Sequence, residues 1–166
     1  MDVTTAIFNR RTIHVFDKKK VSENIIINAV EAANQAPCHR LTFPWRFYSI
    51  GFNKRSQILD LALKIKFNKK DVDNKLKNAF QEKFLNPSHL LLSTQIINKD
   101  ELINKEDYAA CSCAIQNLAI SLTSKGVSSK WSTGIITKHP GIYEITNLDP
   151  SKEEIIGFIW IGHGKN

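Results

Sequence analysis

The segment Ile155–Ile161, with the sequence Ile-Ile-Gly-Phe-Ile-Trp-Ile, carries no charged, amide or hydroxyl side chain. A strand with one face in water alternates apolar and polar residues, whereas a continuous apolar run of this length is typical of a strand covered on both faces. Because helices supply that cover in small domains, the run predicts a sheet with helices packed on both sides.

Helices are expected where apolar residues recur three and four positions apart, and strands where short apolar runs stand between turn residues. Asp2 and Ser22 are placed as N-caps, and Gly126 ends a long helix whose apolar residues nearly encircle it, so we expect that helix to be buried. Two polar helices before residue 87 are expected to face solvent. The expected helices are a short one carrying Ala6 and Arg10, then 22–34, one around 58–65, 72–84, 105–125 and one from Pro140; the expected strands are 45–50, 90–97, 127–131 and 155–161.

These elements predict an α+β fold with a mixed central β-sheet flanked by helices. The 166 residues, 42% of them hydrophobic, suffice for one core, and no composition shift or repeat divides them, so we expect a single domain, residues 1–166. No apolar run has the length of a membrane span, and the N-terminus lacks signal-peptide features. With only three cysteines, these features lead us to expect a cytoplasmic protein without a disulfide framework.

The net charge of +7 raises the possibility of a nucleic-acid partner, but the distribution of cations argues against it. Lysine supplies 18 of the 23 cations, and the lysines are scattered along the chain without interleaved aromatic residues. Four of the five arginines, in contrast, lie in two short segments, as Arg10, Arg11, Arg40 and Arg46. Arginine binds phosphate and carboxylate in a bidentate manner, so these segments predict a specific oxyanion site.

Other chemistry finds less support in the sequence. No glycine-rich phosphate loop is present, and the histidines lack metal-ligand spacing. Cys111 and Cys113 fall on opposite faces of a helix, so we interpret them as small core residues rather than metal ligands. Cys38 beside His39 leaves a nucleophile-and-base pair open, although no third group is evident to orient it. Trp45 and Trp160 are expected in the core.

Several motifs in register nevertheless resemble those of the nitroreductase family of flavoproteins, and the match extends along essentially the whole chain. The correspondence is strongest with the short bacterial members of that family. The motifs are Arg10-Arg11-Thr12, Ala36-Pro37-Cys38-His39, Pro44-Trp45-Arg46-Phe47, Trp131-Ser132-Thr133-Gly134 and the Gly157–Gly162 segment.

The resemblance implies a homodimer with FMN in two pockets at the subunit interface, reduced by NAD(P)H and reoxidised by a small electron-poor acceptor. It implies that the Arg10–Thr12 segment and Lys165 bind the FMN phosphate and that His14 approaches the flavin pyrimidine edge. His39 would come from the other subunit. The implied cofactor-binding residues are Arg10, Arg11, Thr12, His14, His39, Trp131, Ser132, Thr133 and Lys165.

The sequence also departs from the family pattern. His14 replaces an arginine or lysine, Phe43 stands where many members have glutamine, and Ser132 stands where short members carry arginine. The chain ends at Asn166, where relatives usually continue into a tail that reaches the partner. Two interpretations therefore stay open: an FMN-dependent oxidoreductase transferring hydride in a ping-pong cycle, and a flavin-binding or regulatory homodimer with little turnover.

Overall fold

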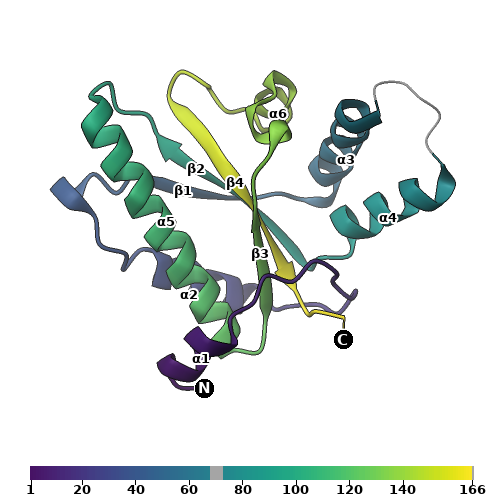
Figure 1. Cartoon of the computed structure of the whole chain (residues 1–166), viewed down its shortest axis with the longest axis horizontal. Helices are drawn as coiled ribbons and strands as arrows, with labels where there is room; N and C mark the ends of the chain where they lie inside the picture. The colour runs from purple at the N-terminus through teal and green to yellow at the C-terminus, as the bar shows by residue number, and fades with distance from the viewer. Residues whose placement is uncertain (68–72, 166) are drawn as a thin grey trace.

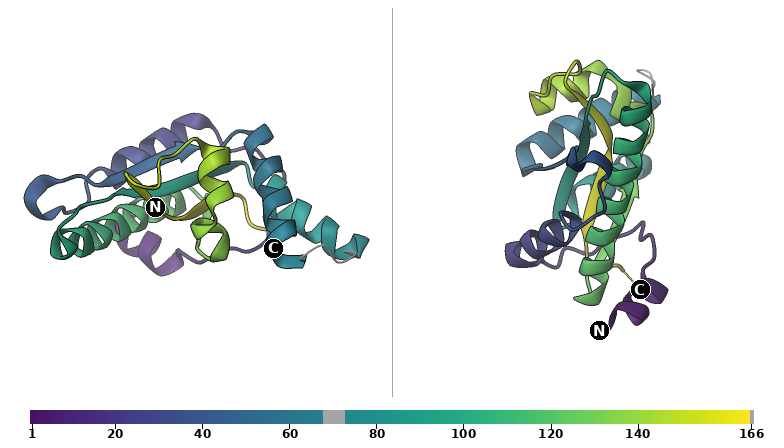
Figure 2. Two further views of the ribbon diagram at one scale, coloured as in Figure 1. Left: turned by 90° about the horizontal axis from the view of Figure 1, so that it is seen from above. Right: turned by 90° about the vertical axis from the view of Figure 1, so that its left-hand side faces the viewer.

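The computed structural model describes residues 1–67 and 73–165, which form a four-stranded sheet with helices on both faces (Figure 1 and Figure 2). The strand order is β1-β2-β4-β3, and all three neighbouring pairs are antiparallel. A parallel contribution comes from an isolated bridge between Thr12 and Ser129. The four expected strands are confirmed: β1 (Trp45–Ser49), β2 (His89–Ile96), β3 (Ser128–Ser132) and β4 (Glu153–Gly162).

The helices follow the expected order, with some shifted ends. Asp2 caps the first helix by accepting a 3.0 Å hydrogen bond from the Thr5 amide, whereas Ser22 sits at its N-cap position without a side-chain bond. Val72 lies outside the described residues. The helices are α1 (Val3–Asn9), α2 (Glu23–Ala33), α3 (Phe52–Phe67), α4 (Asn74–Leu85), α5 (Glu101–Ser124) and α6 (Pro140–Thr146), with short 3-10 turns η1 (His39–Leu41) and η2 (Ile135–Lys138).

Two apolar clusters, one on each face of the sheet, form the core. The first joins α2 and α5 to the sheet and includes Trp45, and the second joins α3, α4 and α6 to the other face and includes Trp160. Both tryptophans are therefore core residues, as expected. The expectation that α3 and α4 only face solvent is wrong, because Ile58 and Phe84 bury an apolar face of each helix in the second cluster.

Strand β4 confirms the prediction of cover on both faces. Its side chains alternate between the two clusters, and Gly157 marks the point where the register with β2 shifts by one residue. Ile155 and Phe158 both join the second cluster although three positions separate them. The extra residue is Ile156, which has no partner on β2 because Ile155 pairs with Thr94 and Gly157 with Ser93.

Helix α5 is only partly buried, which corrects the expectation of a fully buried helix. Cys111 lies in the first cluster, but Cys113 is exposed, so the interpretation of both cysteines as core residues holds for Cys111 alone. Leu102 and Tyr108 on the same helix are also exposed, with 61% and 45% of their surface accessible. The protomer thus leaves one face of its longest helix without an apolar cover. Among the described residues, no helix combines the length and apolar character needed to cross a bilayer.

The bulge at Gly157 gives a test of how tightly β3 packs on β4. A Cβ at this position would meet the Trp131 indole, with Cδ1 at 2.6 Å, and the Ser132 carbonyl oxygen at 3.0 Å. We expect Gly157→Ala to lower the free energy of unfolding by about 1–3 kcal/mol because the indole must move. The measurement is urea denaturation.

Gly51→Ala is the matched control, because a Cβ there meets no atom within 4 Å. We expect it to change the unfolding free energy by less than about 0.5 kcal/mol. Equal stability of the Gly157→Ala variant and the parent protein would contradict the close packing of the indole on the bulge.

Candidate functional site

The N-terminal segment after α1 lies between β3 and the C-terminal tail, and this brings several predicted site residues together. The Ile13 amide donates to the Ser129 carbonyl at 3.3 Å, beside the Thr12–Ser129 bridge. Farther along, the Lys165 amide donates to the Val15 carbonyl at 3.1 Å. These backbone bonds place Lys165 next to the segment that carries the two N-terminal arginines, although the sequence separates them by about the whole chain.

Arg10 and Arg11 leave the end of α1 in different environments. The Arg11 Nη1 donates to the carbonyl oxygens of Phe8 at 2.6 Å and Arg10 at 3.0 Å, which satisfies the free carbonyls at this helix end. The half-buried Arg10 makes no side-chain hydrogen bond to another residue in the described ranges. Of the two arginines, Arg10 is therefore the one whose guanidinium makes fewer hydrogen bonds within the protomer.

His14 contacts a cation that the sequence analysis missed. The Nζ of Lys130 on β3 lies 3.0 Å from the Nδ1 of His14, and because an ammonium group only donates, this ring nitrogen accepts. Burial lowers the pKa of Lys130. Its only sequence signal is its position in the short β-rich segment before Trp131, which the abundance of scattered lysines conceals.

Lys83 on α4 extends the same cationic region. Burial lowers the pKa of Lys83, and the nearby charges of Lys130 and Lys66 lower it further. Like charges held this close oppose each other, so the arrangement costs free energy unless an anion or an electron-rich group joins it. We refer to Arg10, Arg11, His14, Lys83, Lys130 and Lys165 as the cationic cluster.

The end of β3 carries the third predicted group. The Trp131 indole N–H donates to the Ile156 carbonyl at 3.2 Å, and the Ser132 hydroxyl accepts from the Trp160 indole at 2.8 Å, so both side chains are anchored to β4. Of the three predicted residues here, Thr133 lines an open cavity of about 480 Å³, together with Tyr108 and Glu154. Because the Trp131 and Ser132 side chains are hydrogen-bonded to β4, the end of β3 that precedes Thr133 is held against that strand.

His39 lies in a strained loop that α5 holds in place. Arg40, Leu41 and Phe43 all have positive φ angles, between 44° and 62°, which residues with a side chain rarely adopt. The Glu106 carboxylate on α5 holds this loop in place, because its Oε2 lies 3.2 Å from His39 Nδ1 and 3.6 Å from Arg40 Nε.

A polar cluster beneath this loop connects it to the core. Thr42 donates a 2.5 Å hydrogen bond to the buried carboxylate of Asp107, and the Phe43 amide donates to the Cys38 sulfur at 3.1 Å. His39 contacts Glu106 rather than the Cys38 thiol, so the loop contains no nucleophile-and-base pair of these two side chains. Burial raises the pKa of Cys111 to about 12, with Asp107 contributing, so this thiol stays protonated and is no nucleophile near neutral pH.

Helix α1, which ends just before Arg10, and the His39 loop lie at opposite ends of α5. Glu106 holds His39 near the start of the helix, whereas α1 packs beside Asn117 and Ile120 near its end. With 1.5 Å per residue, 14 residues of helix separate these positions by about 21 Å. Figure 1 shows the same separation, with the η1 loop at the far left and α1 at the bottom. One protomer therefore does not bring His39 and Arg10 to the same ligand.

The fold is α+β, and it places Lys130 and His14 beside β3, an edge strand of the sheet. Comparison with known proteins gives the family: the model of the nitroreductase family matches residues 7–163. The chain belongs to the nitroreductase family, a family of oxidoreductases.

Individual relatives agree with this assignment. YfhC of Bacillus subtilis (strain 168), named as a candidate NAD(P)H nitroreductase, is 31% identical over 147 residues, which are 87% of this chain and 75% of the relative. The crystal structure of a nitroreductase-like family protein from Bacillus cereus is 22% identical, covers 100% of this chain and 87% of its own, and superposes with a TM-score of 0.84. A nitroreductase from Bacteroides fragilis NCTC 9343, crystallised with bound FMN, is 22% identical over 99% of this chain and 89% of its own, with a TM-score of 0.74.

Proposed function

We propose that the protein is an FMN-dependent NAD(P)H oxidoreductase that acts as a homodimer of single-domain subunits on a small electron-poor acceptor, of the nitroaromatic or quinone type, in the cytoplasm. The observation that carries this proposal is the separation of Arg10, just after α1, from the His39 loop along α5. A second subunit that turns its His39 loop toward the cluster would complete two equivalent sites, in the manner that the resemblance implies.

The phosphate end of FMN fits the residues around Arg10. A phosphate dianion requires charge-assisted donors, and Arg10, Arg11, the Thr12 hydroxyl and Lys165 supply them from two segments joined by backbone hydrogen bonds. Arg10 has a guanidinium that no other described residue engages.

The flavin ring fits the other end of the cluster. Negative charge accumulates on the pyrimidine edge when a flavin is reduced, and a nearby cation favours that state. We propose that Lys130 supplies this cation and orients His14 by donating to its Nδ1, which leaves the other ring nitrogen free to donate. The replacement of an arginine or lysine by His14 therefore leaves the site with a positive charge, contributed by the neighbouring strand.

The exposed apolar surface favours a dimer that covers α1 and α5. Ile7 and Phe8 on α1 are 48% and 70% exposed, and Leu102 and Tyr108 leave the outer face of α5 uncovered. A dimer that covered these side chains would remove from water apolar surface that the single subunit leaves exposed. In the same subunit, Phe43 of the His39 loop is also exposed, so the interface and the proposed site overlap.

FMN, when bound, accepts a hydride from NAD(P)H and passes it to the acceptor. The chain's own residues need only bind and orient: Arg10 and its neighbours hold the phosphate, Lys130 and His14 hold the pyrimidine edge, and Trp131, Ser132 and Thr133 border the ring. If both substrates occupied the same face of the flavin in turn, the first product would leave before the acceptor bound, which would give ping-pong kinetics.

The direct test is a titration of the purified protein with FMN, followed by flavin absorbance and by oxidation of NAD(P)H with a nitroaromatic acceptor. We expect Arg10→Ala to raise the Kd for FMN about 10- to 100-fold, because a charge-assisted hydrogen bond contributes about 1.5–3 kcal/mol. Lys64→Ala, which removes an exposed lysine on α3, is the control for a change in net charge. Equal affinity of the Arg10→Ala variant and the parent would remove Arg10 from the site.

Lys130→Met tests the role of the neighbouring strand. Loss of the cation should weaken binding of reduced flavin about tenfold more than binding of oxidised flavin, which lowers the midpoint potential of the bound flavin by roughly 30 mV. The measurement is a spectroscopic redox titration of the FMN-loaded protein. A potential that stays the same in the variant would show that Lys130 acts only by packing.

A further inference from the structure

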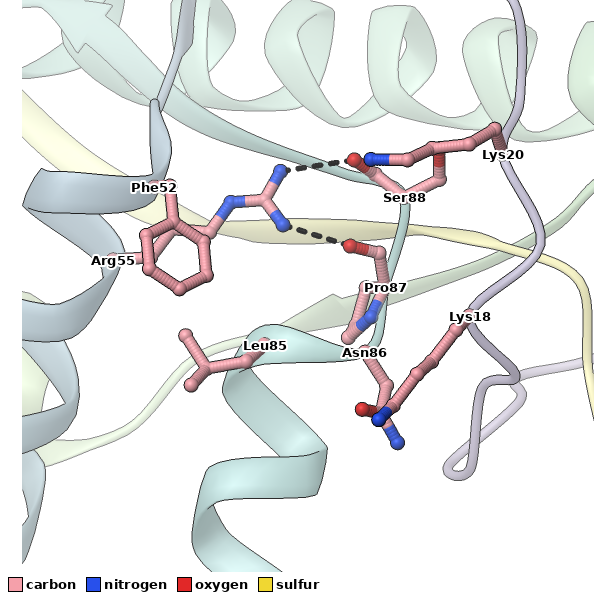
Figure 3. Close-up of a pocket in the computed structure, with 8 residues that line it drawn as sticks. All are labelled: Lys18, Lys20, Phe52, Arg55, Leu85, Asn86, Pro87 and Ser88. Carbon is pink, nitrogen blue, oxygen red and sulfur yellow. Dashed lines mark hydrogen bonds between the residues drawn. The ribbon is translucent and has the colours of Figure 1, made fainter.

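A second positively charged cavity lies outside the cationic cluster, between the segment after Phe16, the start of α3 and the loop from α4 to β2. It encloses about 390 Å³, and its polar lining consists of Lys18, Lys20, Arg55, Asn86 and Ser88 (Figure 3). An adjoining hollow of about 520 Å³ shares Lys18 and Asn86 and continues along α4. No carboxylate lines the first cavity among the residues that the structure describes.

Arg55 is the central feature of this cavity, because it is 92% buried and positively charged. Its guanidinium donates to three backbone carbonyls, those of Ile50 at 3.0 Å, Pro87 at 2.7 Å and Ser88 at 3.2 Å. These bonds use three of its five N–H groups and add no negative charge. Among the described residues, 1–67 and 73–165, Arg55 forms no salt bridge.

The environment of Arg55 therefore opposes its charge. Burial lowers the pKa of this guanidinium, although arginine stays protonated in proteins. A buried cation without a counter-ion is costly, and a bound anion at the two remaining N–H groups would relieve that cost. The three carbonyls hold the fork rigidly, as a binding residue requires.

Two lysines add to the positive potential from the opposite wall. Figure 3 shows the Lys18 and Lys20 side chains directed from their backbone segment toward the loop that carries Asn86 and Ser88. Lys19, between them, does not line the cavity, and its amide donates to the Asp17 carboxylate instead. The chain bends at Lys18, and in this turn Lys18 and Lys20 line the cavity while Lys19 does not.

The rest of the lining is apolar and partly open. Phe52 is 65% exposed at the mouth, and Leu85 and Pro87 complete the wall. Converging cations beside an exposed aromatic ring suit a ligand with an oxyanion at one end and a small apolar body at the other.

We propose that this cavity binds a small organic oxyanion, an aromatic or aliphatic carboxylate or phosphate monoester, whose charged group meets Arg55, Lys18 and Lys20 and whose apolar body packs on Phe52. The adjoining hollow is lined by Asn78 and Glu82 of α4. Lys83 of the same helix does not line it, and its pKa is lowered in part by the charge of Lys130 in the cationic cluster. The proposal does not depend on flavin binding, so either can fail without the other.

The test is calorimetric titration of the full chain, incubated with FMN and then freed of unbound FMN, with benzoate, phenyl phosphate and inorganic phosphate. We expect saturable binding of benzoate or phenyl phosphate, with a Kd of about 1 mM or lower. The double variant Lys18→Ala/Lys20→Ala should lose at least tenfold in affinity, while Lys19→Ala, with one cation removed from the same segment, should bind as the parent does. The lysine variants carry the test because loss of the three Arg55 bonds would endanger folding.

Three results would overturn the proposal. The first is the absence of saturable binding by both aromatic ligands. The second is a loss of affinity in Lys19→Ala that is half or more of the loss in the double variant on a logarithmic scale, which would indicate attraction by net charge alone. The third is inorganic phosphate binding as tightly as phenyl phosphate, which would show that the apolar wall takes no part. A preference between benzoate and phenyl phosphate distinguishes a carboxylate site from a phosphate site.

Discussion

The pairing of the N-terminal segment with both β3 and the C-terminal tail is the constraint on which the proposed site depends. Bonds from Ile13 to Ser129 and from Lys165 to Val15 join three parts of the chain that are far apart in sequence. They bring Lys130 and Lys165 to the extended segment that follows the two arginines. Without this pairing, the segments that carry Arg10, Lys130 and Lys165 would not be connected, and the proposed shared binding of one ligand would lose its structural basis.

Bringing cations together without anions costs free energy, and a bound anion would offset part of that cost. Burial and like charges already lower the pKa of Lys83 near Lys130. A ligand that binds only the folded state returns that free energy as stability. The strained loop around His39 fits the same account, because Glu106 holds conformations that isolated residues disfavour at a place where the proposed dimer needs a fixed shape.

Much of the fold follows from the sequence, because it depends on local periodicity. The run Ile155–Ile161 predicted a strand covered on both faces, and the N-cap at Asp2 and the helix start at Pro140 also follow from local chemistry. The partial exposure of α5 could not be deduced, because apolar residues that cover a partner and those that fill a core look alike in sequence. Lys130 and Arg55 were missed for a different reason: their significance comes from which distant residues the sheet places beside them.

The claim that each site combines Arg10 from one subunit with His39 from the other is tested most directly by subunit complementation. Arg10→Ala and His39→Ala proteins are each expected to bind FMN weakly alone. If they are unfolded and refolded together in equal amounts, half of the dimers contain one intact site, so tight FMN binding should return at roughly a quarter of all sites. Unchanged weak binding after mixing, or native affinity in the His39→Ala protein alone, would contradict the shared site.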